Sequence, residues 1–375
     1  MERLIERVRD ARDAKTALDI RGGDTKRFYG HAPRGDAFDV RELSGITSYE
    51  PTELVVTALG GTPLKELEEV LAERGQCMPF EPPRFGSLGT VGGMVAAGLA
   101  GPARASVGPL RDFVLGVSLL DGKGEMLTFG GQVMKNVAGY DVSRLMAGSM
   151  GVLGVICEVS LKVMPSMPAC RTLYFDVDEA GALNRLNRWA GQSIPVNASS
   201  WHRGRLSVRL AGAKAAIGCA RERLGGQDRL SGQDLFSGQG CWDAQDIEAQ
   251  TAASWWADLR DHRHPFFVIA QSDLERGECL WRLSVPDTAP PLSLPGEQFI
   301  EWGGAQRWWR STAPAALIRS TAAAVGGHAT LVRAADKSPG GFAALNQSLM
   351  QVHKRLKYAF DPEGIFNPGR LYPGL

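Results

Sequence analysis

The sequence predicts an α+β protein with two lobes, and three observations support this fold class. Strand-like and helix-like segments mix without the strict alternation that a doubly wound parallel sheet requires. Three clusters of glycine lie at the ends of predicted strands within the first 165 residues. The composition changes after Pro165, and all nine tryptophans follow that residue. Together these features indicate a glycine-rich first lobe and a tryptophan-rich second lobe.

The first 75 residues predict two helices with short strands between them. A charged amphipathic helix opens the chain over residues 1–15, because its apolar residues share one face. The strands are expected at residues 17–20, 46–49 and 53–59. A second helix follows, with Thr62 as its cap, Pro63 at its first position and Gly75 at its end.

The rest of the first lobe predicts a hairpin and a further strand. The apolar segments 114–120 and 126–129 are separated by a glycine turn and form the hairpin. Apolar and polar residues alternate from Val155 to Val163, which predicts a strand with one buried face. Pro165 ends this strand and marks the boundary between the lobes.

The second lobe alternates strand-like and helix-like pieces. Its strands are expected at residues 173–177, 206–210, 266–270 and 280–285. Residues 227–240 are rich in glycine, glutamine and serine and predict a loop. A helix is expected at 342–360, before the sequence DPEGIFNPGRL. We therefore divide the chain into a first lobe at 1–165, a second lobe at 166–320 and a C-terminal segment at 321–375.

Composition excludes several classes of function. The 375 residues carry a formal net charge of +1 without a polybasic run, which argues against nucleic acid or an acidic membrane surface as a partner. No apolar run reaches the roughly 18 residues of a membrane span, and the charged N-terminus lacks a signal peptide's apolar centre. We therefore expect a cytoplasmic chain without direct membrane insertion. The six cysteines include no C-x-x-C pair, so neither zinc nor an iron–sulfur cluster is expected.

Glycine clusters are the main candidates for a binding site. They lie at residues 20–26, 84–116 and 148–154. Their density is too high for the interior of a helix or strand, so the backbone there must approach something closely. A tightly turned structural loop is the alternative. Neither G-x-G-x-x-G nor the P-loop pattern occurs, so three clusters at strand ends favour a long dinucleotide bound in another way.

The order of the motifs resembles a known family. RGGDTK, GSLGTVGG and GYDVSRLMAGSMGVLG, followed by NPGRL near the end, resemble the FAD-binding domain of the vanillyl-alcohol-oxidase (PCMH) type. The segments GLAGPARASVGPLRDFVLG, FGGQVMKNVAGYDVSRL and WGGAQRWW resemble, more narrowly, the FAD-binding E subunits of bacterial glycolate oxidases. The resemblance implies a PCMH-type FAD-binding lobe of two subdomains, an α/β cap lobe, and a C-terminal tail that returns to the FAD lobe.

The resemblance also implies which residues bind FAD. They are Arg21, Gly22, Gly23, Asp24, Thr25, Leu88, Gly89, Thr90, Val91, Gly92, Gly93, Tyr140, Gly151, Gly154, Ile156, Asn367 and Arg370. Some relatives bond the flavin through a histidine in the first motif, whereas Thr25 stands at that place here, so the resemblance implies non-covalent FAD. Many relatives carry an acidic residue at the position where this chain has Met150. Tyr140 belongs to the polar segment Lys135–Asp141, whose position between the cofactor motifs favours a site over a solvated loop.

The candidates for substrate chemistry lie in the later part of the chain. Related 2-hydroxy acid dehydrogenases hold the substrate at a histidine-rich metal site with an H-x-G-D-G-N pattern. That pattern is not found here, and the nearest segment, Gly326–Thr330, offers His328 alone, so no metal is expected. Arg307 and Arg310 lie among tryptophans and are candidates to hold a carboxylate. A surface cation–π cluster is the alternative for these arginines.

The resemblance implies an FAD-binding subunit of a 2-hydroxy acid oxidoreductase, with glycolate as the substrate. The expected partners are a sister FAD-binding subunit and an iron–sulfur subunit, and any association with a membrane runs through them. Two alternatives remain open. One is a non-catalytic flavin-binding or assembly subunit whose sister chain oxidises the substrate, which the missing metal motif favours for the isolated chain. The other is an unrelated FAD-dependent oxidase of alcohols or sugars.

Overall fold

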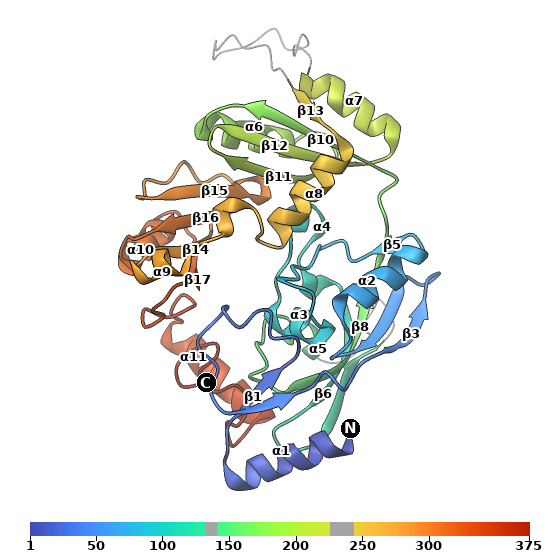
Figure 1. Ribbon diagram of the computed structural model, residues 1–375, viewed down its shortest axis with the longest axis vertical. Helices are drawn as coiled ribbons and strands as arrows, with labels where there is room; N and C mark the ends of the chain where they lie inside the picture. Colours follow the sequence, from blue (N-terminus) through green and yellow to red (C-terminus); the bar gives the residue numbers. More distant parts are fainter. Residues whose placement is uncertain (132–140, 226–243) are drawn as a thin grey trace.

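The computed structural model describes residues 1–131, 141–225 and 244–375. Figure 1 shows two lobes, each built on one antiparallel sheet. The lower lobe contains a five-stranded sheet of order β3-β4-β8-β6-β7, and the upper lobe contains an eight-stranded sheet of order β13-β10-β12-β11-β15-β16-β14-β17. The predicted loop at 227–240 and the predicted site segment at 135–140, including Tyr140, lie outside the described residues.

The five-stranded sheet forms the centre of the lower lobe. Its strands are β3 (Ile46–Glu50), β4 (Val55–Leu59), β6 (Val114–Leu120), β7 (Met126–Gly130) and β8 (Val155–Lys162). The hairpin predicted at 114–129 is therefore present as β6 and β7. The prediction of one buried face for the strand after Val155 is wrong, because six of the eight residues of β8 are buried. The central position of β8, between β4 and β6, explains why neither of its faces is open to water.

Helices and a small parallel sheet surround this centre. Helix α1 (Glu2–Ala14) buries Leu4 and Val8 against the parallel pair β1 (Leu18–Arg21) and β2 (Asp36–Asp39). Helix α2 (Leu64–Glu73) packs into the main core of the lobe. Thr62 does not cap α2, because its hydroxyl is engaged with the backbone of Gly45.

Short elements complete the lower lobe. Strand β5 (Gln76–Cys77) pairs with β9 (Met164–Pro165). The short helices of this lobe are α3 (Val91–Ala97), α4 (Arg104–Val107), η1 (Leu110–Asp112) and α5 (Val142–Leu145).

Helix α3 corrects the prediction that the glycine density excludes a helix. The helix contains Gly92 and Gly93, and the Thr90 side chain caps it by accepting a hydrogen bond of 3.2 Å from the Gly93 N–H. A Cβ atom on Gly92 would lie 2.9 Å from the Gly60 carbonyl oxygen. The helix therefore lies against the turn after β4, and that close approach, not flexibility, is the reason for glycine there.

The eight-stranded sheet carries helices on both faces. Its strands are β10 (Ala169–Asp176), β11 (Val196–His202), β12 (Arg205–Gly212), β13 (Gln245–Ile247), β14 (Cys279–Ser284), β15 (Glu297–Glu301), β16 (Gln306–Ser311) and β17 (His328–Arg333). Its helices are α6 (Glu179–Ala190), α7 (Lys214–Gly225), α8 (Ala249–Arg260), η2 (Pro265–Phe267), α9 (Gln271–Glu275), η3 (Trp302–Gly304) and α10 (Ala315–Ala324). The strand predicted at 266–270 is wrong, because Pro265 begins the single turn η2 at that place.

The chain leaves the upper lobe after β17 and runs down beside the lower one through α11 (Gln347–Phe360) (Figure 1). There the Leu18 N–H donates to the Ile365 carbonyl at 2.7 Å, and the Asn367 N–H donates to the Leu18 carbonyl at 2.9 Å. The division of the chain at 165 and 320 stays a prediction. Residue 320 lies inside α10, and the later strand β17 belongs to the eight-stranded sheet.

Candidate cofactor site

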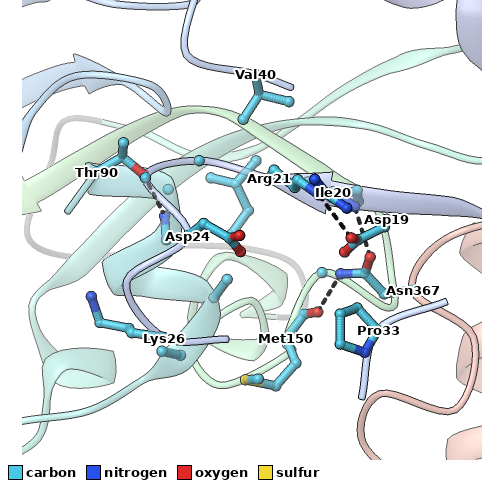
Figure 2. A pocket seen from close by; sticks show the side chains of 18 of the residues that line it. Asp19, Ile20, Arg21, Asp24, Lys26, Pro33, Val40, Thr90, Met150 and Asn367 are labelled. Atoms are coloured by element: carbon cyan, nitrogen blue, oxygen red, sulfur yellow. Dashed lines mark hydrogen bonds and ion pairs between the residues drawn. The ribbon is translucent and has the colours of Figure 1, made fainter. Parts of the chain in front are cut away.

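A cavity that is partly open to solvent lies in the lower lobe beside β1 (Figure 2). Four segments that are distant in the sequence contribute most of its lining: residues 19–27, residues 90–97 of α3 and its cap, residues 150–156, and the C-terminal segment with Asn367 and Arg370. The fold therefore brings the three glycine clusters and the NPGRL motif together around one space.

The loop after β1 presents unpaired backbone donors to this cavity. Within the described parts of the chain, no group accepts a hydrogen bond from the N–H of Gly22, Gly23, Asp24 or Thr25. Asp24 has a φ of +56°, which turns the backbone at the middle of the loop. Successive N–H groups in such a turn form a concavity that binds anions such as a pyrophosphate. A buried or partly buried N–H group without an acceptor in the protein also indicates that a bound ligand provides the acceptor.

The same loop packs tightly against the residues that precede α3. A methyl group on Gly23 would overlap the carbonyl oxygen of Leu88, and a methyl group on Gly22 would overlap the Thr90 hydroxyl. The glycine loop and residues 88–90 therefore form one packed unit. Glycine is required at both positions because the second chain occupies the place of a side chain.

Asn367 connects three of the segments around the cavity. Its amide oxygen accepts a hydrogen bond of 2.8 Å from the Ile20 N–H, and its amide nitrogen donates to the Met150 carbonyl at 2.7 Å (Figure 2). A Cβ atom on Gly151 would lie 2.6 Å from that amide nitrogen. The side chain lines the cavity, but its hydrogen bonds to the protein hold β1, the loop at 150 and the C-terminal segment in place.

We expect Asn367→Ala to lower the free energy of unfolding by about 3 kcal/mol. The change leaves the Ile20 N–H and the Met150 carbonyl without partners, and a buried unsatisfied group costs about 1–3 kcal/mol. Urea unfolding of the purified chain measures the effect. Asn187→Ala is the matched control, because the partly exposed Asn187 side chain makes one long bond, of 3.3 Å, to the Asp287 carbonyl. A loss no larger than that of the control would contradict the role given to Asn367.

Several charged side chains line the cavity. Asp19 accepts from Arg21 at 2.8 Å and from Arg27 at 3.1 Å. Lys26 lines the cavity and is otherwise surrounded by protein atoms, and this burial lowers the pKa of its ammonium group to about 8, against the opposing charge of Asp261. Burial also lowers the pKa of Arg370 to about 10.

Arg370 supports the loop that follows the glycine motif. Its guanidinium group donates to the carbonyl oxygens of His31, Lys26 at 3.3 Å and Arg27 at 3.2 Å. Arg370, which the family resemblance implies as an FAD-binding residue, thus donates to backbone carbonyls. Its side chain fixes the shape of the loop that carries Lys26.

The structure places most of the predicted cofactor residues on this cavity. The residues that line it are Arg21, Gly22, Gly23, Asp24, Thr25, Thr90, Gly92, Gly93, Gly151, Gly154, Ile156, Asn367 and Arg370. Three predicted residues do not: Leu88 is exposed, Val91 is buried in the core, and Gly89 packs against Leu64 behind the loop. Sequence reasoning missed the lining residues Asp19, Ile20, Lys26, Arg27, Pro33, Val40, Ala96, Ala97, Met150 and Val155. Among these, Lys26 had a signal, because it ends the RGGDTK motif.

The predicted catalytic residues are not brought to the cavity. Arg307 is fully buried, and its guanidinium group donates to the carbonyl oxygens of Gly304, Pro290 and Ala289. Arg310 forms two hydrogen bonds to Glu278, of 3.1 and 2.7 Å. His328 is exposed at the first position of β17. These arginines have protein partners already, which corrects the prediction that they hold a substrate carboxylate. No group of three or more metal-ligating side chains occurs in the described ranges.

The residues present fit a flavin dinucleotide. The unpaired N–H groups of Gly22–Thr25 suit its pyrophosphate, and apolar side chains such as Val40 and Ala97 suit the walls around its rings. Thr25 lies on the cavity wall and has no ring nitrogen that would bond to the flavin.

Comparison with known proteins identifies the family. Residues 1–130 match the family model described as FAD binding domain. Glycolate oxidase subunit GlcE of Escherichia coli (strain K12) is 43% identical over 372 residues, which cover 99% of this chain and 97% of that protein. The chain belongs to the GlcE family.

Two further comparisons place the GlcE family among its relatives. Glycolate oxidase subunit GlcD of Bacillus subtilis (strain 168) is 28% identical over 165 residues, which cover 43% of this chain and 35% of that protein. Alkyldihydroxyacetonephosphate synthase shares the fold with a TM-score of 0.63 at 15% identity, covering 99% of this chain and 76% of that one. The predicted α+β fold class and the predicted FAD cofactor are confirmed. The names GlcD and GlcE denote subunits, so the family belongs to a multi-subunit glycolate oxidase.

In the part of the chain that the structure describes, no helix is long and apolar enough to cross a membrane.

Proposed function

We propose that this chain is the FAD-binding E subunit of a glycolate-oxidising assembly. The observation that carries the proposal is the row of unpaired N–H groups at Gly22–Thr25, on a cavity that the family's motifs line from four segments. When bound, FAD supplies a two-electron acceptor for a hydride from the carbon that bears the substrate hydroxyl. The chain's own residues hold the cofactor: the glycine loop through its N–H groups, and Asn367 by fixing the walls of the cavity.

We further propose two partner chains, a sister FAD-binding subunit and an iron–sulfur subunit. Reduced flavin carries two electrons, and a relay of single electrons needs a cluster with cysteine ligands. The cysteine spacing of this chain suggests no such cluster. Any association with a membrane runs through these partners. Affinity purification through a tag on this chain should recover both; recovery of this polypeptide alone, active with glycolate and oxygen, would refute the assembly.

A non-catalytic role in the same assembly is the second candidate. The observation that favours it is the position of Arg307 and Arg310, whose donors are engaged with protein groups. Anaerobic addition of glycolate to the FAD-loaded chain separates the two roles through the visible spectrum of the flavin. Bleaching of the isolated chain supports substrate oxidation on this chain. Bleaching that requires the sister subunit supports the non-catalytic role, and no bleaching in the full assembly would refute glycolate oxidation.

We expect the flavin to be bound without a covalent bond. Thr25 has a hydroxyl where a covalent link would need a histidine nitrogen. Precipitation of the yellow protein with acid should therefore leave a colourless pellet and release FAD to the supernatant. Yellow colour that stays in the washed pellet would contradict the prediction, while a protein that is colourless and takes up no added FAD would contradict cofactor binding itself.

A further inference from the structure

Three cationic side chains meet at the boundary between the lobes without a carboxylate partner. Lys26 comes from the loop after β1, Arg282 from β14 and Arg333 from β17. Within the described residues, no carboxylate oxygen lies within 4.0 Å of any of them. Each rests on an aromatic ring instead: Lys26 at 5.7 Å from the Phe85 centroid, Arg282 at 5.6 Å from that of Tyr29, and Arg333 at 3.7 Å from that of Phe28.

These rings place the three cations in one cluster. The centroid of Phe85 lies 5.1 Å from that of Phe28 and 4.9 Å from that of His262. The charges of both Arg333 and Arg282 act on His262, so both guanidinium groups lie near that ring. Lys26 also lines the cofactor cavity. The cluster therefore begins at the cavity wall and continues onto the face of the eight-stranded sheet.

Two neighbouring cations each donate to several backbone carbonyls, whereas Arg282 and Arg333 do not. Lys337 donates to the carbonyl oxygens of Phe28, Gly30 and Val332, and Arg319 donates to three carbonyls of the segment 339–342. By contrast, the Arg333 side chain has no hydrogen bond to any described residue, and its buried Nε atom has no partner. Arg282 donates only to the Tyr29 hydroxyl, at 2.9 Å. The free guanidinium donors of Arg282 and Arg333 are therefore available to a ligand.

The surroundings of the cluster favour an anionic ligand. Burial lowers the pKa of Arg333, so holding its charge there costs stability. His262 contributes no charge, because burial, with the charges of Arg333 and Arg282, lowers its pKa to about 3, and its buried Nδ1 atom has no partner. Arg104 adds a further positive charge, resting on Trp302 at 4.7 Å. The charge of Asp261 acts on Lys26 and His262, but this carboxylate is already paired with Arg260 and Arg263. An anion that binds beside Arg282 and Arg333 would compensate the charges of these two arginines.

We propose that Arg282 and Arg333, with Lys26, bind the carboxylate of a small 2-hydroxy acid beside the cofactor cavity. The planar forks of two arginines match a carboxylate, which each holds through paired N–H groups. The pyrophosphate of the cofactor has its own donors at Gly22–Thr25, so it does not account for these cations. The identity of the acid rests on the proposed function, while the site itself rests on the unpaired donors.

The test measures glycolate binding rather than turnover. Calorimetric titration of the FAD-loaded full chain, with the flavin reduced beforehand so that no reaction follows, gives the dissociation constant. We expect Arg282→Met and Arg333→Met each to weaken glycolate binding at least tenfold, with FAD content unchanged. Arg203→Met is the matched control, because Arg203 belongs to the upper lobe and its side chain is 75% exposed. Its affinity for glycolate should equal that of the wild type.

Thermal unfolding separates a binding role from a structural one. Arg333→Met removes a buried charge that has no protein partner, so its midpoint should equal or exceed that of the wild type while glycolate binding falls. A lowered midpoint with unchanged glycolate affinity would overturn the proposal. So would a wild-type chain that binds no glycolate, or one that binds inorganic phosphate as tightly as glycolate. Flavin bleaching by glycolate in the full assembly tests the proposed function separately and stands or falls independently of these titrations.

Discussion

We expect Gly23→Ala to abolish FAD binding, with a loss of affinity of more than 100-fold, or about 2.7 kcal/mol. A Cβ atom at this position would coincide with the Leu88 carbonyl oxygen, which is a backbone atom and has no rotamer that moves it away. The methyl group therefore separates the glycine loop from residues 88–90. The N–H groups of Gly22–Thr25 then lose the arrangement that makes them converge on one anion.

Fluorescence titration of the apoprotein with FAD measures this loss. Gly218→Ala is the matched control, because Gly218 lies in α7 with no atom within 4 Å of its added Cβ. Alanine is the better helix former, so this control should keep its FAD affinity and gain a little stability. A Gly23→Ala protein that binds FAD as tightly as the control would show that the glycine loop is not the anion site.

The glycine loop illustrates what the sequence could predict. Glycine at 22, 23 and 151 carries a local signal, because its lack of a side chain implies a close approach whatever the partner is. The partner itself is not local: Leu88 lies 65 residues after Gly23, and Asn367 lies more than 200 residues after Gly151. That Gly23 meets Leu88 and Gly151 meets Asn367 could be expected only from the family that the order of the motifs resembles.

Helix α3 shows where local rules failed. Two glycines in seven residues predict no helix by propensity, yet Thr90 caps Val91–Ala97, and packing on the turn after β4 holds it. Tertiary packing outweighs a propensity cost of about 1 kcal/mol per glycine. The same packing requires glycine, so the residues that argued against the helix are the ones that allow it.

The arginines of the cap show the limit of reading a site from residue types. Arg307 and Arg310 lie among tryptophans in the sequence, which is the pattern expected of arginines that bind a carboxylate in a site that excludes water. Side chains alternate along β16, so Arg307 lies on the same face of the sheet as Trp309. Trp309 packs with Ile318 of α10, on the side away from the lower lobe. Arg282 and Arg333 carry no sequence signal, because their lack of acidic partners becomes visible only once the two lobes are assembled.

The C-terminal return of the chain depends on a buried ion pair. The Lys357 ammonium group donates to Asp361 at 2.6 Å and to the carbonyl oxygens of Val152 and Phe366 at 2.7 and 2.8 Å. Asp361 in turn accepts from the N–H groups of Ile365 and Phe366. Both side chains are buried, at 7% and 1% exposure. This network fixes the segment that carries Asn367 to the loop beside the cofactor cavity.

We expect Lys357→Met to lower the free energy of unfolding by about 3–5 kcal/mol, because it leaves the Asp361 carboxylate buried and unpaired. Lys354→Met, which removes an exposed lysine from the same helix, should change stability by less than about 0.5 kcal/mol. The double variant Lys357→Met with Asp361→Asn should recover part of the loss, since no uncompensated charge remains. Guanidinium unfolding of the wild type, these three variants and the single variant Asp361→Asn gives these values. If the double variant were as unstable as the sum of its single changes, the hydrogen bonds to backbone carbonyls, and not the ion pair, would hold the C-terminal segment in place.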